Sequence, residues 1–132
     1  MRTGQCYNAV MSDETKHRVW HVENLESWQG IVQRALTKNG YLVTTTGTAT
    51  EAKKMVPALI QDIEVAILDG NLEDGNGEDV AALSRNSKLS IGIIGLSDNL
   101  TTWADVSLDK TDFERDQLLA TVAKLIAAST HA

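Results

Sequence analysis

Apolar residues gather in five short runs, each separated from the next by a longer polar or amphipathic segment. The clearest run covers residues 65–68, ends at Asp69 and is followed by turn-forming residues up to Gly77. A continuous apolar run of this length is typical of a strand that is buried on both faces, as in a parallel sheet. We expect five strands, at residues 18–22, 41–45, 65–69, 91–96 and 104–108.

Four other segments carry apolar residues at helical spacing, and they alternate with the strands. We expect helices at residues 25–36, from residue 48 onward, at 77–85 and at 112–128. Thr48 and Glu51 have the spacing of a capping box at the start of the second helix. Pro57 lies inside that helix and should kink or split it.

Strands that alternate with helices pair in parallel through right-handed crossovers, which predicts a doubly wound, five-stranded α/β sheet. With the strand order 2-1-3-4-5, the first, third, fourth and fifth strands are neighbours. Their carboxyl ends carry Glu23, Asp69, Ser97 and Lys110. Open α/β sheets bind ligands at that edge, so we expect these side chains to form one site. For Asp69 taken alone, capping of the following helix is an equally good explanation.

The charge and composition argue against several classes of function. The net charge is −6 and no basic stripe is present, so we expect no direct contact with nucleic acid. No apolar run approaches the ~18 residues of a membrane span, so we expect no membrane segment. The single cysteine, Cys6, fits a reducing environment and predicts a cytoplasmic protein.

One domain is expected from 132 residues, of which 42% are hydrophobic and 23% charged. We expect a flexible leader at 1–17, in which Met11 is an alternative start, a domain at 18–128 and a tail at 129–132. His21 lies inside the first strand without partners at metal-ligand spacing. We therefore expect a hydrogen-bonded core histidine.

Three short motifs, in this order along the chain, resemble the receiver domain of bacterial two-component response regulators. They are the stretch from Leu68 to Gly77 around Asp69-Gly70, the strand 93–97 that ends at Ser97, and Asp109-Lys110. The resemblance covers residues 18–128. It implies a flavodoxin-like receiver fold and a phosphorelay signalling domain rather than an enzyme.

The resemblance also implies a role for each strand-end residue. Asp69 would accept a phosphoryl group from a histidine kinase or a histidine phosphotransfer protein, forming an acyl phosphate. Lys110 would balance the phosphoryl charge, and the Ser97 hydroxyl would bond a phosphoryl oxygen. A weakly bound Mg²⁺ would be held by oxygen ligands. The implied ligands are Glu23, Asp69, the Asn71 backbone carbonyl and, weakly, Asn24.

Four positions depart from the family's pattern. Asn24 stands where a second acid is expected, which removes one negative charge and should weaken Mg²⁺ binding. Asp98 follows the hydroxyl residue, where the family has a small residue. Ser107 replaces an aromatic residue of the fifth strand, and Thr111 replaces a proline after the lysine.

The segment between the fourth and fifth strands is also short. Lys110 follows Ser97 by only 13 residues, and a parallel crossover alone needs about a dozen. We therefore expect the fourth helix to be shortened or missing, which would open one side of the last two strands. A partner protein or a second copy would cover this face with Trp103 near its edge. Alternatively, Trp103 folds back and fills the gap.

Two other functions stay open. The first is a pseudo-receiver that binds a partner without phosphorylation, which Asn24, Asp98 and Ser107 favour. The second is an α/β enzyme that binds a nucleotide or a flavin. The acidic loop at 23–26 argues against the enzyme because it lacks the glycines that let backbone amides approach phosphate.

Overall fold

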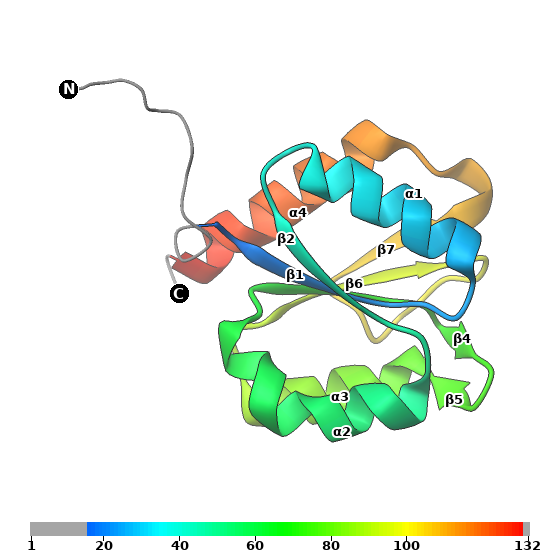
Figure 1. Cartoon of the computed structure of the whole chain (residues 1–132), viewed down its shortest axis with the longest axis vertical. Coiled ribbons are helices and arrows are strands. Elements are labelled where there is room, and N and C mark those ends of the chain that lie inside the picture. The colour runs from blue at the N-terminus through cyan, green and yellow to red at the C-terminus, as the bar shows by residue number, and fades with distance from the viewer. Residues whose placement is uncertain (1–15, 131–132) are drawn as a thin grey trace.

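The computed structural model describes residues 16–130, which form a parallel five-stranded sheet between two layers of helices (Figure 1). The sheet order is β2-β1-β3-β6-β7, so the predicted fold class and strand order are confirmed. Cys6, Met11 and most of the predicted leader lie outside the described residues. The sheet strands are β1 (Arg18–Val22), β2 (Leu42–Thr46), β3 (Val65–Leu68), β6 (Gly92–Ser97) and β7 (Val106–Asp109).

Helices α1 (Glu26–Thr37) and α4 (Arg115–Thr130) cover one face of the sheet, and α2 (Ala49–Leu59) and α3 (Gly77–Ser87) cover the other (Figure 1). Helix α4 ends two residues beyond the predicted position, so the first part of the predicted tail is helical. Within residues 16–130, no helix is long and apolar enough to cross a membrane.

Helix α2 begins as its sequence predicts, because the Glu51 N–H donates to Thr48 Oγ1 at 3.1 Å. It passes through Pro57 without a break, so of the two predicted effects the split is wrong and the kink stays a prediction. Pro57 lies in the last turn of the helix, where its missing N–H removes a single backbone bond. The chain then continues as a 3-10 turn, η2 (Ile60–Asp62).

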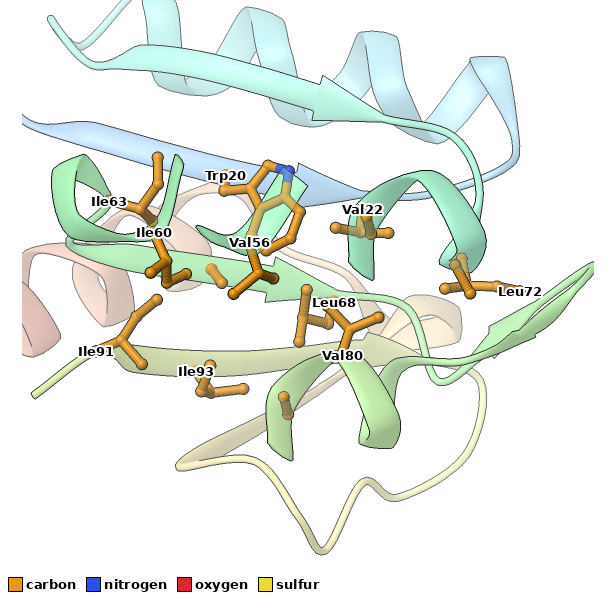
Figure 2. Close-up of a cluster of buried hydrophobic side chains, with 14 residues drawn as sticks. Trp20, Val22, Val56, Ile60, Ile63, Leu68, Leu72, Val80, Ile91 and Ile93 are labelled. Carbon is orange, nitrogen blue, oxygen red and sulfur yellow. The ribbon is translucent and has the colours of Figure 1, made fainter. Parts of the chain in front are cut away.

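Alternate side chains of each central strand pack on opposite faces of the sheet. On the α2–α3 side, Trp20, Leu68 and Ile93 belong to one buried cluster (Figure 2). The residues next to them in the sequence, such as Ile67 beside Leu68 and Ile94 beside Ile93, belong to a second cluster under α1 and α4. Burial of each such side chain contributes roughly 1.5–3 kcal/mol, so this double packing fixes the strand register and hence the strand ends.

The crossover from β6 to β7 contains no helix, which confirms the predicted loss of the fourth helix. Residues 98–105 instead fold back over the sheet. Thr101 is buried, and both its N–H and its hydroxyl donate to Ser107 Oγ at 3.0 Å. A side chain at Gly95 would overlap Thr101, so the glycine permits this close approach.

A second set of contacts ties this segment to α3. Arg85 Nη1 donates to the Trp103 carbonyl at 2.6 Å, and Arg85 Nη2 lies 3.4 Å from Asp105 Oδ1. Asp105 Oδ2 in turn accepts from the Ile93 N–H at 2.7 Å. Trp103 packs against the cluster under α2 and α3, as in the alternative in which it fills the gap.

The prediction that the last two strands expose an apolar face is therefore wrong. Ile91 and Ile93 are only 4% and 0% exposed. The reason is local, because Thr101 and Trp103 occupy the space that a helix would fill. A partner protein or second copy at this face stays a prediction.

The turn after Asp69 is more ordered than expected from its sequence. It forms a small hairpin of β4 (Asn71–Leu72) and β5 (Gly75–Asn76). Asp74 at its tip accepts from the Ala49 and Thr50 N–H groups at 2.7 and 2.9 Å. Hydrogen bonds from Thr50 and Ala49 lower the pKa of Asp74 to about 2. The hairpin therefore caps α2 and anchors the loop that follows Asp69.

Candidate functional site

Four polar side chains lie at the carboxyl edge of the sheet, where their strands end. Glu23 follows β1, Asp69 follows β3, Ser97 ends β6 and Lys110 follows β7. Glu23, Asp69 and Ser97 are 0%, 5% and 2% exposed. Burying a polar group costs free energy unless it has a hydrogen-bonding or charged partner. The burial of these three side chains therefore indicates a functional site rather than ordinary surface residues.

Lys110 joins the two carboxylates. Its Nζ lies 2.7 Å from Glu23 Oε1 and 3.1 Å from Asp69 Oδ2, and its side chain is 6% exposed. The remaining oxygens accept backbone hydrogen bonds: Glu23 Oε2 from the Leu25 N–H at 3.2 Å, and Asp69 Oδ1 from the Asn71 N–H at 3.1 Å. Two buried carboxylates thus share one ammonium group.

One ammonium balances only one of the two carboxylates, so the cluster has an excess of negative charge when both are ionised. Burial raises the pKa of Glu23 to about 7; Lys110 opposes that rise and Asp69 adds to it. Burial would lower the pKa of Lys110, but hydrogen bonds and attraction to the two carboxylates outweigh it, so the pKa is raised. Lys110 therefore stays charged at neutral pH, while Glu23 is poised to take up a proton.

Ser97 lies beside this cluster without a hydrogen bond to it among the described residues. Its Oγ accepts from the Asn99 N–H at 3.5 Å and faces Gly70, where an added Cβ would come within 3.1 Å of it. A cavity of about 180 Å³ opens here. It is lined by Gly70, Asn71, Ser97, Asn99, Leu100, Thr101 and Trp103. Ser97 and the two residues that follow Asp69 therefore line the same cavity.

Magnesium takes oxygen ligands, often one or two carboxylates together with waters, and the described residues offer few such groups. Within residues 16–130, no group of three or more His, Cys, Asp or Glu side chains is arranged to hold a metal ion. Both carboxylates are already engaged by Lys110, and residue 24 offers a neutral amide. The site therefore offers Mg²⁺ few ligands, in line with the predicted weak binding. The implied ligand set stays a prediction: Glu23, Asp69, the Asn71 backbone carbonyl and Asn24.

Two residues near Lys110 have environments that the sequence did not reveal. The Lys110 Nζ lies 5.2 Å from the centroid of the Trp28 ring, a cation–π contact. Trp28 lies in the segment predicted as the first helix, 25–36, and no contact with Lys110 was predicted for it. Trp28 lies in the first turn of α1, directly after the acidic loop, and this position could have indicated a contact with the site.

His21 is buried as predicted, but among residues 16–130 neither of its ring nitrogens has a hydrogen-bond partner, so the hydrogen-bonded interpretation is wrong. Burial lowers the pKa of His21 to about 4; Lys110 lowers it further and Asp69 opposes this. The histidine is therefore neutral at physiological pH and unable to serve as a charged member of the site.

The sheet order is shared with solved structures of response regulator receiver domains. A CheY-like receiver domain from Methanospirillum hungatei JF-1 is 16% identical, with a TM-score of 0.79 over 89% of this chain and 98% of that chain. The response regulator TrrA from Thermotoga maritima, solved in complex with Mg²⁺-BeF, is 27% identical. Its TM-score is 0.74 over 83% of this chain and 98% of that chain.

The non-phosphorylated HemR receiver domain from Leptospira biflexa is 22% identical, with a TM-score of 0.73 over 85% of this chain and 95% of that chain. No family model matches the sequence, and no curated protein matches it either. The structural matches confirm the resemblance to receiver domains that the motifs predicted.

Proposed function

We propose that this receiver domain acts in a phosphorelay, with Asp69 accepting a phosphoryl group from a histidine of a kinase or phosphotransfer protein. The observation that carries the proposal is the Lys110 ammonium, held 3.1 Å from Asp69 Oδ2 in a buried cluster. The domain would then signal through protein contacts in the cytoplasm.

The proposed transfer is a displacement at phosphorus. A carboxylate oxygen of Asp69 bonds to phosphorus while the bond from phosphorus to the donor imidazole nitrogen breaks. The imidazole leaves with the bonding pair and takes up a proton. Lys110 balances the charge of the phosphoryl oxygens, and the Ser97 hydroxyl donates to one of them.

Glu23 keeps Lys110 within the site during this exchange. Its Oε1 is 2.7 Å from the ammonium, so Lys110 remains next to a carboxylate even when an Asp69 oxygen becomes part of the acyl phosphate. An ammonium that is already oriented loses little freedom when the phosphoryl group arrives. The Glu23–Lys110 pair thus prepares the site for the incoming charge.

The experiment is incubation with a small phosphodonor and Mg²⁺, followed by intact-mass measurement. Wild type is expected to gain one phosphoryl group and Asp69→Asn none. Asp112→Asn removes an exposed carboxylate and should behave like wild type. An adduct that persists in Asp69→Asn would contradict the assignment.

A second candidate is the phosphorylation-independent pseudo-receiver. It is favoured by Asn24 and by the two carboxylates that already satisfy Lys110. A wild-type chain that gains no phosphoryl group, while the same donor modifies a known receiver, would support this candidate. The nucleotide- or flavin-binding enzyme is weaker, because the Leu25 N–H near the start of α1 is already bonded to Glu23.

Magnesium enters the proposal as an accessory ion that would neutralise charge between two anions. We expect Asn24→Asp to tighten Mg²⁺ binding by about tenfold, because two unit charges ~4 Å apart interact by roughly 1–4 kcal/mol between water and a protein surface. Titration of tryptophan fluorescence with Mg²⁺ measures the change. Asn86→Asp, at an exposed position on α3, is the matched control. Equal affinity in wild type and Asn24→Asp would show that residue 24 does not face the ion.

A further inference from the structure

Lys110 makes a third contact that the proposed transfer does not use. Its Nζ lies 5.2 Å from the centroid of the Trp28 ring. The same ring makes an edge-to-face contact with Phe113, with centroids 5.2 Å apart and planes at 85°. Trp28 belongs to α1, and Phe113 lies two residues before α4. One aromatic pair therefore joins the ammonium to both helices on this face.

On the opposite side of β7, Trp103 packs against the cluster under α2 and α3, and no ring contact of Trp103 with Lys110 is found among the described residues. Ser107 points into the crossover segment, and its Oγ accepts two hydrogen bonds from Thr101. That segment is held to α3 through Arg85. On one side of β7, Ser107 is therefore already hydrogen-bonded to Thr101. On the other side, Lys110 contacts the Trp28 ring, so we expect a movement of Lys110 to affect this ring first.

We propose that Trp28 positions Lys110 and that the Trp28–Phe113 pair transmits a change at Asp69 to the α1–α4 face. The transmission half rests on the proposed function, since it needs a phosphoryl group on Asp69. The positioning half holds for the unmodified domain.

The physical reason is competition for one ammonium. In the unmodified site, Lys110 lies between two carboxylates and the face of the indole, and the ring attracts the charge electrostatically. A phosphoryl group on Asp69 moves negative charge outward from the carboxylate. The ammonium follows it, and its distance from the ring increases. Trp28 then loses a favourable contact and repacks against Phe113, which changes the start of α4.

The positioning half is tested through the rate of adduct formation. Trp28→Leu is expected to slow it about three- to tenfold, the size of a partly buried cation–π contact, and Trp28→Phe to recover most of the loss. Tyr41→Leu is the matched control, because Tyr41 is a half-buried aromatic residue packed on the same cluster. A rate lost equally in Trp28→Leu and Tyr41→Leu would indicate a purely structural role and overturn the positioning.

The transmission half is tested by ¹⁹F NMR of the chain labelled with 5-fluorotryptophan. Conservative substitution of each tryptophan by phenylalanine assigns the three signals of Trp20, Trp28 and Trp103. We expect the phosphodonor to shift the Trp28 signal in wild type and to leave it unchanged in Asp69→Asn. A shift of the Trp103 signal with an unchanged Trp28 signal would place transmission in the crossover segment and overturn the proposal.

The two failures can be told apart. Absence of the phosphoryl adduct by intact mass would contradict the proposed function. The position of Lys110 over the ring would still be tested without phosphorylation, because Glu23→Gln and Lys110→Met should each move the Trp28 signal. Unchanged signals in both variants, with both folded by circular dichroism, would overturn the positioning of Lys110 by Trp28.

Discussion

Lys110→Met is expected to lower the free energy of unfolding by roughly 3 kcal/mol at pH 8, because removal of one member of a buried ion cluster leaves uncompensated charge. Lys110 is 6% exposed and touches Glu23 and Asp69 at 2.7 and 3.1 Å. Without it, the two carboxylates repel each other in a desolvated site. Chemical denaturation of both proteins measures the loss.

The loss should also depend on pH. Burial already raises the pKa of Glu23 to about 7, so without Lys110 this carboxyl takes up a proton even more readily. We therefore expect a smaller loss at pH 5 than at pH 8. The double variant Glu23→Gln/Lys110→Met should recover part of the stability, and Lys124→Met, at an exposed position of α4, should lose little. Equal losses for Lys110→Met and Lys124→Met would contradict the buried cluster.

His21→Leu is expected to change how stability depends on pH. The folded chain lowers the pKa of His21 from 6.5 to about 4 by burial, with Lys110 adding to the effect. Between these values the unfolded chain binds a proton that the folded chain does not, so wild type loses stability as the pH falls through this range. A shift from 6.5 to about 4 corresponds to about 3 kcal/mol once the pH is below both values.

Glu23 contributes a slope of the opposite sign. Its pKa rises on folding from 4.5 to about 7, so this group stabilises the fold below pH 4.5 and loses that contribution as the pH rises through 7. The two slopes oppose each other between pH 4.5 and 6.5 in wild type. His21→Leu removes one of them, so the variant should be more stable at pH 5 than at pH 7.5. Urea unfolding at both values checks this, and parallel curves for wild type and variant would contradict it.

The sequence predicted the sheet and the strand-end residues because both depend on local pattern. The continuous apolar run before Asp69 requires burial on both faces, and the short spacing from Ser97 to Lys110 leaves no room for a helix. The β4–β5 hairpin was missed because its residues are turn formers, and its order comes from contacts between Asp74 and α2.

Side-chain partners could not be predicted in the same way. Both possible positions of Trp103 agreed with the pattern, and the choice depends on Arg85 and on the close approach of Thr101 to Gly95. The sequence also could not predict that the His21 ring has no hydrogen-bond partner among the described residues, because hydrogen bonding of the ring depends on which neighbours face the same side of the sheet. Such contacts are set by tertiary packing rather than by periodicity.

Acceptance of a phosphoryl group by Asp69 is tested most directly by chemical trapping. An acyl phosphate is reduced by borohydride, whereas a free carboxylate is not, so a phosphorylated aspartate becomes homoserine. Wild type is treated with phosphodonor and borohydride, digested, and the peptides that contain residues 69, 74, 98 and 109 are sequenced by tandem mass spectrometry. We expect homoserine at position 69 and unmodified aspartate at positions 74, 98 and 109. Homoserine at another position, or an unmodified Asp69 in a chain that carries the phosphoryl adduct, would contradict the assignment.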